Sequence, residues 1–189
     1  MKKIIEKARE WALEEIKTNG VPPQGLFELS NEKGQELASK LKCDKDIVLL
    51  GTILMDIKLG ECFKKGKIME HVARSVAAAD EFLKGFNLSD EAKKRILNCV
   101  EAHHGTKEYI CKEAEICANA DCYRFLHPKG IFIYFNILGK RLKDLSEIME
   151  QVESKMDEKH NILSLDICKQ ELEGYYQQFK KMFESARSM

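Results

Sequence analysis

One acidic residue lies inside the most apolar part of the chain. Asp56 belongs to the stretch ILMDIKLGE, residues 53–61, which continues an apolar run that begins at Ile47. Burial of a carboxylate is unfavourable unless the group pairs with a cation or binds a metal ion. The sequence therefore predicts a partner for Asp56, and the type of that partner decides what chemistry this segment performs.

Three of the five histidines lie where they could be that partner. His71 begins the segment EHVARSVAAADEFL, and His103 and His104 end the segment ILNCVEAHHG. Adjacent side chains on a regular helix diverge by about 100°, but Gly105 is expected to end the helix and let both imidazoles turn toward one ion. A second acid in an apolar segment, Asp121, lies in AEICANADCYRF.

Three imidazoles and two carboxylates form a ligand set for one divalent ion of the first transition row. The predicted ligands are Asp56, His71, His103, His104 and Asp121. Mixed nitrogen and oxygen ligands suit Mn, Fe, Zn or Ni, with water at the open positions. Such an ion lowers the pKa of bound water and supplies a hydroxide nucleophile at neutral pH. A His-His pair alone is also typical of a helix end that binds no metal.

Helices must position these side chains, because only three prolines and little strand-like alternation predict an all-α fold. We expect Asp44 and Ser89 to cap helix starts. The segment IFIYFNIL is expected to be helical or irregular, and GECFKKGK is expected to be a loop. The expected helices cover residues 2–17, 22–41, 45–60, 68–83, 89–104, 109–125, 141–159 and 165–186.

The composition predicts one domain over residues 1–189, without a membrane span. The longest apolar run, Ile47 to Ile57, is too short to cross a bilayer. The acids among the first residues argue against a signal peptide, and the seven cysteines form no CxxC pair, so we expect reduced thiols and a cytoplasmic protein. A net charge of zero argues against nucleic acid as a partner.

Taken in order along the chain, four stretches resemble the HD-domain superfamily of helical metal-dependent phosphohydrolases. They are ILMDI, EHVARSVAAADEFL, ILNCVEAHHG and AEICANADCYRF. The resemblance covers about residues 27–125 and implies a single-domain helical bundle of the HD-domain type, to which the C-terminal helices are appended.

The sequence departs from this family's pattern at the first of two ions. Two-metal members hold that ion with a histidine of an early helix, the histidine of a His-Asp pair and a final Asp. Here Ser30 and Met55 stand at the two histidine positions. Carried over, the first ion keeps only Asp56 and Asp121, and a thioether is a poor replacement ligand. The second ion keeps its carboxylate and all three histidines.

The resemblance implies hydrolysis of a phosphate ester or nucleotide with one divalent ion. Asp121 or Glu101 would serve as the base. In the family a lysine often stands three residues after the Asp of the His-Asp pair. Here Leu59 occupies that position and Lys58 lies one residue earlier; Lys58 is the third catalytic candidate. Further cations that could receive a phosphate are Lys64, Lys65, Lys67, Arg74, Lys107 and Arg124.

Two other classes of function stay open at this point. A catalytically inactive HD-like domain would bind a metal, a nucleotide or a protein partner without turnover, because two expected histidines are missing. A purely structural helical protein would pair Asp56 with a histidine or a lysine. The metal content and a phosphatase and phosphodiesterase panel separate these classes. A homodimer also stays open.

Overall fold

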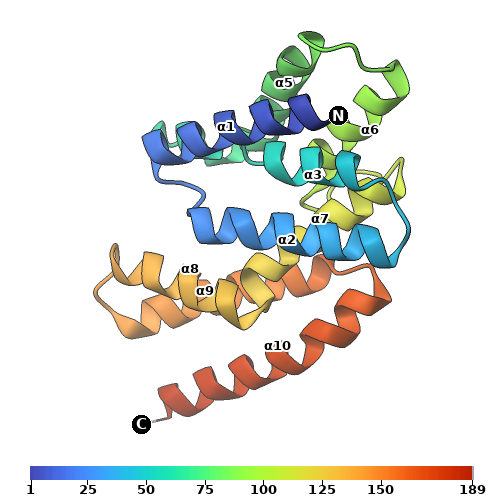
Figure 1. Cartoon of the computed structure of the whole chain (residues 1–189). Coiled ribbons are helices and arrows are strands. Elements are labelled where there is room, and N and C mark those ends of the chain that lie inside the picture. The colour runs from blue at the N-terminus through green and yellow to red at the C-terminus, as the bar shows by residue number, and fades with distance from the viewer. Residues whose placement is uncertain (189) are drawn as a thin grey trace.

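The chain is built from helices, and the computed structural model describes residues 1–188 (Figure 1). Within that range no strand occurs, so the all-α prediction is confirmed. The elements are α1 (Lys2–Asn19), α2 (Gln24–Lys40), α3 (Lys45–Leu54), α4 (Leu59–Lys64), the 3₁₀ helix η1 (Ile68–Glu70), α5 (His71–Lys84), α6 (Asp90–Ala102), α7 (Lys112–Leu126), α8 (Pro128–Gly139), α9 (Leu145–Ile162) and α10 (Asp166–Arg187).

Helix α7 is the centre of the fold. In Figure 1, α1, α5 and α6 lie at one end of the molecule and α8, α9 and α10 at the other. α7 contacts α2, α3 and α6 as well as α8, α9 and α10. A helix that is packed on all sides needs small or apolar side chains, and three alanines and two cysteines of α7 are buried. Asp121 and Arg124 are buried on the same helix.

The predicted helix starts are confirmed by their caps. The Asp44 carboxylate accepts hydrogen bonds from the backbone N–H groups of Asp46 and Ile47 at 3.0 and 3.2 Å. The Ser89 hydroxyl accepts one from the Ala92 N–H at 3.2 Å. Each cap satisfies donors that a helix start leaves free. The segment IFIYFNIL lies within helix α8, so its helical alternative is the one observed.

The apolar run around Asp56 is not one helix. α3 ends at Leu54 rather than near Gly60, residues 55–58 form a turn, and α4 occupies part of the expected loop. Tertiary contacts replace the helical pattern here, since the Lys58 N–H donates to the Ser75 hydroxyl at 3.2 Å. The turn carries the Asp56 carboxylate out of the helical register.

The two C-terminal helices are amphipathic. α10 buries Cys168, Leu172, Phe179 and Phe183 along one stripe. α9 buries apolar residues and also Lys159, which has no exposed surface. In the part of the chain that the structure describes, no helix is both long and apolar enough to cross a membrane.

Glu113 links three helices away from the histidines. Its carboxylate accepts one hydrogen bond from the Asp44 N–H at 3.1 Å and pairs with Arg95 at 2.6 Å. Burial alone raises the pKa of Glu113, but the backbone N–H groups and the Arg95 guanidinium outweigh it and hold this pKa below its ordinary value of 4.5.

We predict that Glu113→Gln lowers the free energy of unfolding by about 1–3 kcal/mol near neutral pH, because a buried acceptor and its ion pair are lost. A lowered carboxyl pKa stabilises the fold above the unfolded-state pKa and loses that effect as the pH falls through the folded-state pKa. Urea denaturation should therefore show the difference between the two proteins shrinking below about pH 4.5. Glu81→Gln, at a side chain that is 75% exposed, is the control and should change little.

Candidate functional site

The Asp56 carboxylate faces two kinds of partner. Its Oδ2 atom lies 2.5 Å from Nη1 of Arg124. Its Oδ1 atom lies 3.6 Å from Nε2 of His71 and 3.6 Å from Nε2 of His103. The side chain of Asp56 is only 10% exposed. Although burial raises the pKa of this carboxyl, the Arg124 guanidinium and the contact with His103 hold it well below its usual range.

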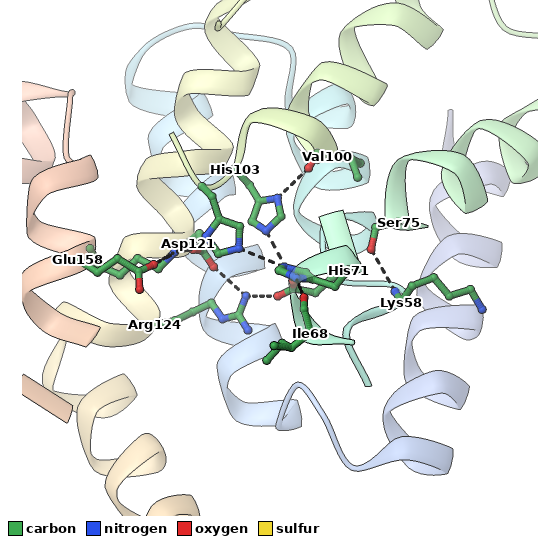
Figure 2. A network of polar contacts seen from close by, with 12 residues as sticks. Lys58, Ile68, His71, Ser75, Val100, His103, Asp121, Arg124 and Glu158 are labelled. Carbon is green, nitrogen blue, oxygen red and sulfur yellow. Dashed lines mark hydrogen bonds and ion pairs between the residues drawn. The ribbon is translucent and has the colours of Figure 1, made fainter. Parts of the chain in front are cut away.

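Backbone carbonyls fix the tautomers of two histidines. His71 begins α5, and its Nδ1 lies 2.6 Å from the Ile68 carbonyl oxygen. His103 follows α6, and its Nδ1 lies 2.7 Å from the Val100 carbonyl oxygen. Figure 2 shows both contacts. A carbonyl only accepts, so Nδ1 carries a proton in each ring, and in the neutral ring Nε2 keeps its lone pair. Metal-binding histidines are held in this way by their other nitrogen.

His104 is held in the opposite tautomer. Its Nδ1 lies 3.0 Å from Nζ of Lys159, an ammonium that only donates. The proton of neutral His104 is therefore on Nε2, which donates to Nε2 of His71 at 3.1 Å. Burial, together with the neighbouring His103 ring and the positive charge of Lys159, lowers the pKa of His104 to about 3, so the ring is neutral.

The three histidines gather as the sequence predicts, but their roles differ. One nitrogen from each of His71, His103 and His104 lies within 4.8 Å of the others. Nε2 of His103 is buried and has no hydrogen-bond partner among the described residues. Nε2 of His71, Nε2 of His103 and Oδ1 of Asp56 are donor types that a divalent first-row ion accepts. His104 would join them only after exchanging its tautomer and releasing Lys159.

Asp121 lies in an ion-pair network rather than against the histidines. Its Oδ1 atom lies 2.8 Å from Nη1 of Arg124, and its Oδ2 atom lies 2.6 Å from Nζ of Lys159. Figure 2 shows Arg124 directed at Asp121. Burial raises the pKa of Asp121, but Lys159 and Arg124 outweigh that effect and lower it strongly. The side chains of Asp121, Arg124 and Lys159 are 2%, 5% and 0% exposed.

Lys159 belongs to the site but was not predicted from the sequence, because the residues of its helix form a charged, amphipathic pattern typical of a surface helix. The available signal was its position. Ile148, Val152 and Met156 form the buried stripe of α9, and Lys159 continues their spacing by three residues. A lysine on the apolar stripe of a helix needs a buried anion, and that anion is Asp121.

A cavity of about 330 Å³ opens beside this network. Asp56, His71 and His104 line it together with Asp121 and Arg124. Its other walls combine cations with apolar and aromatic groups, among them Lys155, Lys159, Arg141, Phe63, Phe125, Tyr134 and Leu138. The lining of the cavity therefore combines charged groups with apolar and aromatic surface.

Two catalytic candidates lie elsewhere. Nζ of Lys58 lies 2.8 Å from Glu15, and Figure 2 shows Lys58 extended away from the histidines. Glu101 shares the face of α6 that carries Leu97 and lines a separate cavity. Neither residue lines the cavity of about 330 Å³.

Of the six further cations predicted to receive a phosphate, Arg124 lines the cavity. Lys64, Lys65, Lys67, Arg74 and Lys107 are absent from its walls. Local sequence does not reveal which face of a helix lines a cavity, so the sequence could not distinguish Arg124 from the other five cations.

The two positions that replace expected histidines offer no ligand. The Ser30 hydroxyl donates to the Phe27 carbonyl of its own helix at 3.0 Å. The Met55 side chain is packed in the core and is 1% exposed. This half of the predicted site therefore keeps only the two carboxylates, and both are paired with cations.

Comparison with known proteins shows the fold. No family model matches the chain. Ribonuclease Y from Finegoldia magna is 30% identical over 122 residues, which are 65% of this chain, and the chain spans only 22% of that relative. A crystal structure described as a predicted HD superfamily hydrolase from an uncultured Thermotogales bacterium matches 100% of this chain and 91% of its own at a TM-score of 0.66 and 14% identity. The chain has an HD-domain fold, as the four sequence stretches predict.

We predict strong coupling between Asp56 and Arg124, because each neutralises the other in the interior. With metal chelated, Asp56→Asn should lower the free energy of unfolding by about 3–5 kcal/mol, since it leaves a buried cation short of a partner. Adding Arg124→Met should cost less than the sum of the single changes by about 0.5–3 kcal/mol. Urea denaturation measures all three variants.

Glu14→Gln is the control for this cycle. Glu14 is 67% exposed, and its ion-pair contact with Lys17 is long at 3.8 Å. It should change the free energy of unfolding by less than about 0.5 kcal/mol. Strictly additive effects of the Asp56 and Arg124 changes would contradict the pairing.

Proposed function

We propose that this chain is a phosphohydrolase of the HD type that uses one divalent first-row ion and acts on a phosphate ester or a nucleotide. One observation carries the proposal: the unprotonated Nε2 atoms of His71 and His103 both face Oδ1 of Asp56, at the edge of a cavity lined by cations. Those three residues would hold the ion, with His104 as a further ligand after its tautomer exchanges. Bound there, the ion would polarise a phosphoryl oxygen or activate water.

Arg124 has the geometry to receive a phosphate. Its Nη1 atom contacts both acids, whereas its Nε atom is buried without a hydrogen-bond partner in the described part of the chain. A guanidinium presents its N–H groups in a planar fork that matches phosphate oxygens. In this proposal Arg124 offers N–H groups to a phosphate in the cavity that it lines, while the acids keep the side chain in place.

The remaining walls fit the organic part of a small ester. Lys155 and Arg141 would add positive charge toward the entrance, and Phe63, Phe125 and Tyr134 supply apolar surface. Ligand sites commonly combine an apolar lining with a few placed polar groups. Asp121 is a weak base because its pKa is strongly lowered, so in this proposal it positions Arg124 and Lys159.

An HD-like domain that binds a metal or a nucleotide without turnover is the second candidate. The observation that favours it is the pairing of both acids with cations, which leaves no carboxylate beside the cavity with a raised pKa. Stoichiometric metal together with inactivity across a substrate panel would support this second candidate.

We predict that untagged protein binds one Mn²⁺ or Fe²⁺ per chain and that His103→Ala removes it, because Nε2 of His103 loses its place beside Asp56. Loss of the ligand should lower phosphatase activity at least about 100-fold, the upper range seen when an outer-shell partner of a metal ligand is removed. Atomic absorption gives the metal content. His127→Ala is the control, since His127 packs near Tyr175 instead.

The activity panel should contain p-nitrophenyl phosphate, bis-p-nitrophenyl phosphate, nucleotides and a single-stranded RNA, the last because one relative is named ribonuclease Y. Absence of stoichiometric metal after supplementation with Mn²⁺ or Fe²⁺ would refute the hydrolase proposal.

We predict that Lys155→Met raises KM about tenfold for an accepted phosphate ester and leaves kcat nearly unchanged, which corresponds to about 1.4 kcal/mol of binding. The reason is that Lys155 lines the cavity but contacts neither acid of the network. Steady-state kinetics measure both constants. Lys112→Met, at a half-exposed lysine on the start of α7, should change neither of them, and an equal effect there would remove Lys155 from the site.

A further inference from the structure

Two buried carboxylates from different elements meet at one cation. Asp56 comes from the turn after α3 and Asp121 from α7, and both contact the single Nη1 atom of Arg124, at 2.5 and 2.8 Å. Lys159 of α9 occupies the other oxygen of Asp121 at 2.6 Å. Two acids therefore share two cations, and the group of four has no net charge.

We propose that Arg124 and Lys159 are resident cations that take the place of a divalent ion between Asp56 and Asp121, so that this chain holds at most one metal ion, at the histidines. The inference rests on the proposed function only for the ion at the histidines. The exclusion of an ion between the acids follows from the contacts of Asp56 and Asp121 with Arg124 and of Asp121 with Lys159.

Position and charge both support the exclusion. Nη1 of Arg124 lies within hydrogen-bond distance of both carboxylates, which is where an ion bridging them would be. A guanidinium stays charged in proteins, so a divalent ion entering there would meet a fixed positive charge. The ion would also have to displace the side chains of Arg124 and Lys159, which are 5% and 0% exposed.

Lys159 adds a second effect on the histidine half of the site. By donating to Nδ1 of His104 at 3.0 Å it keeps the proton of that ring on Nε2. The same ammonium therefore pairs with Asp121 and withdraws one imidazole from the ligand set. The remaining acceptor nitrogens are Nε2 of His71, which accepts from His104, and Nε2 of His103, which has no hydrogen-bond partner among the described residues.

The experiment is to count metal ions after each cation is removed. Untagged protein, stripped with chelator, is dialysed against Mn²⁺ up to about 1 mM, the range of weak oxygen-ligand sites, and its metal content is measured. We expect one ion in the unchanged protein, none in His103→Ala and two in Arg124→Met. We expect one ion in the double variant Arg124→Met/His103→Ala, now between the acids. Lys155→Met is the matched control and should keep one ion.

A third change locates the extra ion. Adding Asp121→Asn to Arg124→Met should return the count to one, because one of the two acids is lost. Two ions in the unchanged protein would overturn the inference, and so would a folded Arg124→Met protein that gains none. No ion in the unchanged protein but one in Arg124→Met would refute the proposed function and support the resident cations.

Folding of Arg124→Met is followed by circular dichroism with chelator and with Mn²⁺. Folding only in the presence of Mn²⁺ would support the inference, since the ion then replaces the guanidinium. Lys159→Met is the second variant and is expected to gain an ion at the freed Asp121 oxygen and His104 nitrogen. Failure of both variants to fold with Mn²⁺ would show that an ion cannot replace these cations, and would overturn the inference.

Discussion

The burial of two carboxylates around one guanidinium is the constraint on which the rest of the site depends. Asp56 and Asp121 are 10% and 2% exposed, and neither could remain charged in the interior without a cation. Arg124 meets both, and Lys159 completes the neutralisation. The network joins the end of α3, the central helix α7 and the buried stripe of α9, so segments distant in sequence must pack together before any of these charges is stable.

This network divides the site into two chemically different halves. On one side of Asp56, oxygen Oδ2 is fully engaged by Arg124. On the other side, Oδ1 faces two imidazole nitrogens at 3.6 Å, too far for a hydrogen bond. The first half is satisfied by the protein alone, whereas the second half leaves His103 Nε2 buried and unpaired. A buried acceptor without a donor is unfavourable, and a ligand at this point would satisfy it.

The sequence could predict the parts of this site that depend on local pattern. Asp44 and Ser89 cap their helices as their residue types indicate, and Asp56 is buried and paired as its apolar surroundings require. The histidine cluster is also confirmed.

The identity of the partners could not be predicted from local pattern. Arg124 lies 68 residues from Asp56, and Lys159 lies 55 residues from His104. The tautomer of His104 depends on an ammonium placed by tertiary packing, whereas the carbonyls that contact His71 and His103 are three residues away in sequence. Lys58 stands one residue before the position at which the family often has a lysine, and the turn before α4 directs its ammonium toward Glu15 on α1.

The proposed replacement of an ion by Arg124 and Lys159 would change what the site can contribute to a reaction without removing its positive charge. A divalent ion between the acids would supply charge and an activated water, whereas Arg124 supplies charge and directional N–H groups only. Water activation is then left to the histidine half, and Asp121 cannot assist because its pKa is strongly lowered. A hydrolase built in this way would combine one ion with one fixed guanidinium on the two sides of Asp56. If the histidine half held no ion, Arg124 and Lys155 would still give the cavity positive charge, and the second proposed function, binding without turnover, would fit the site better.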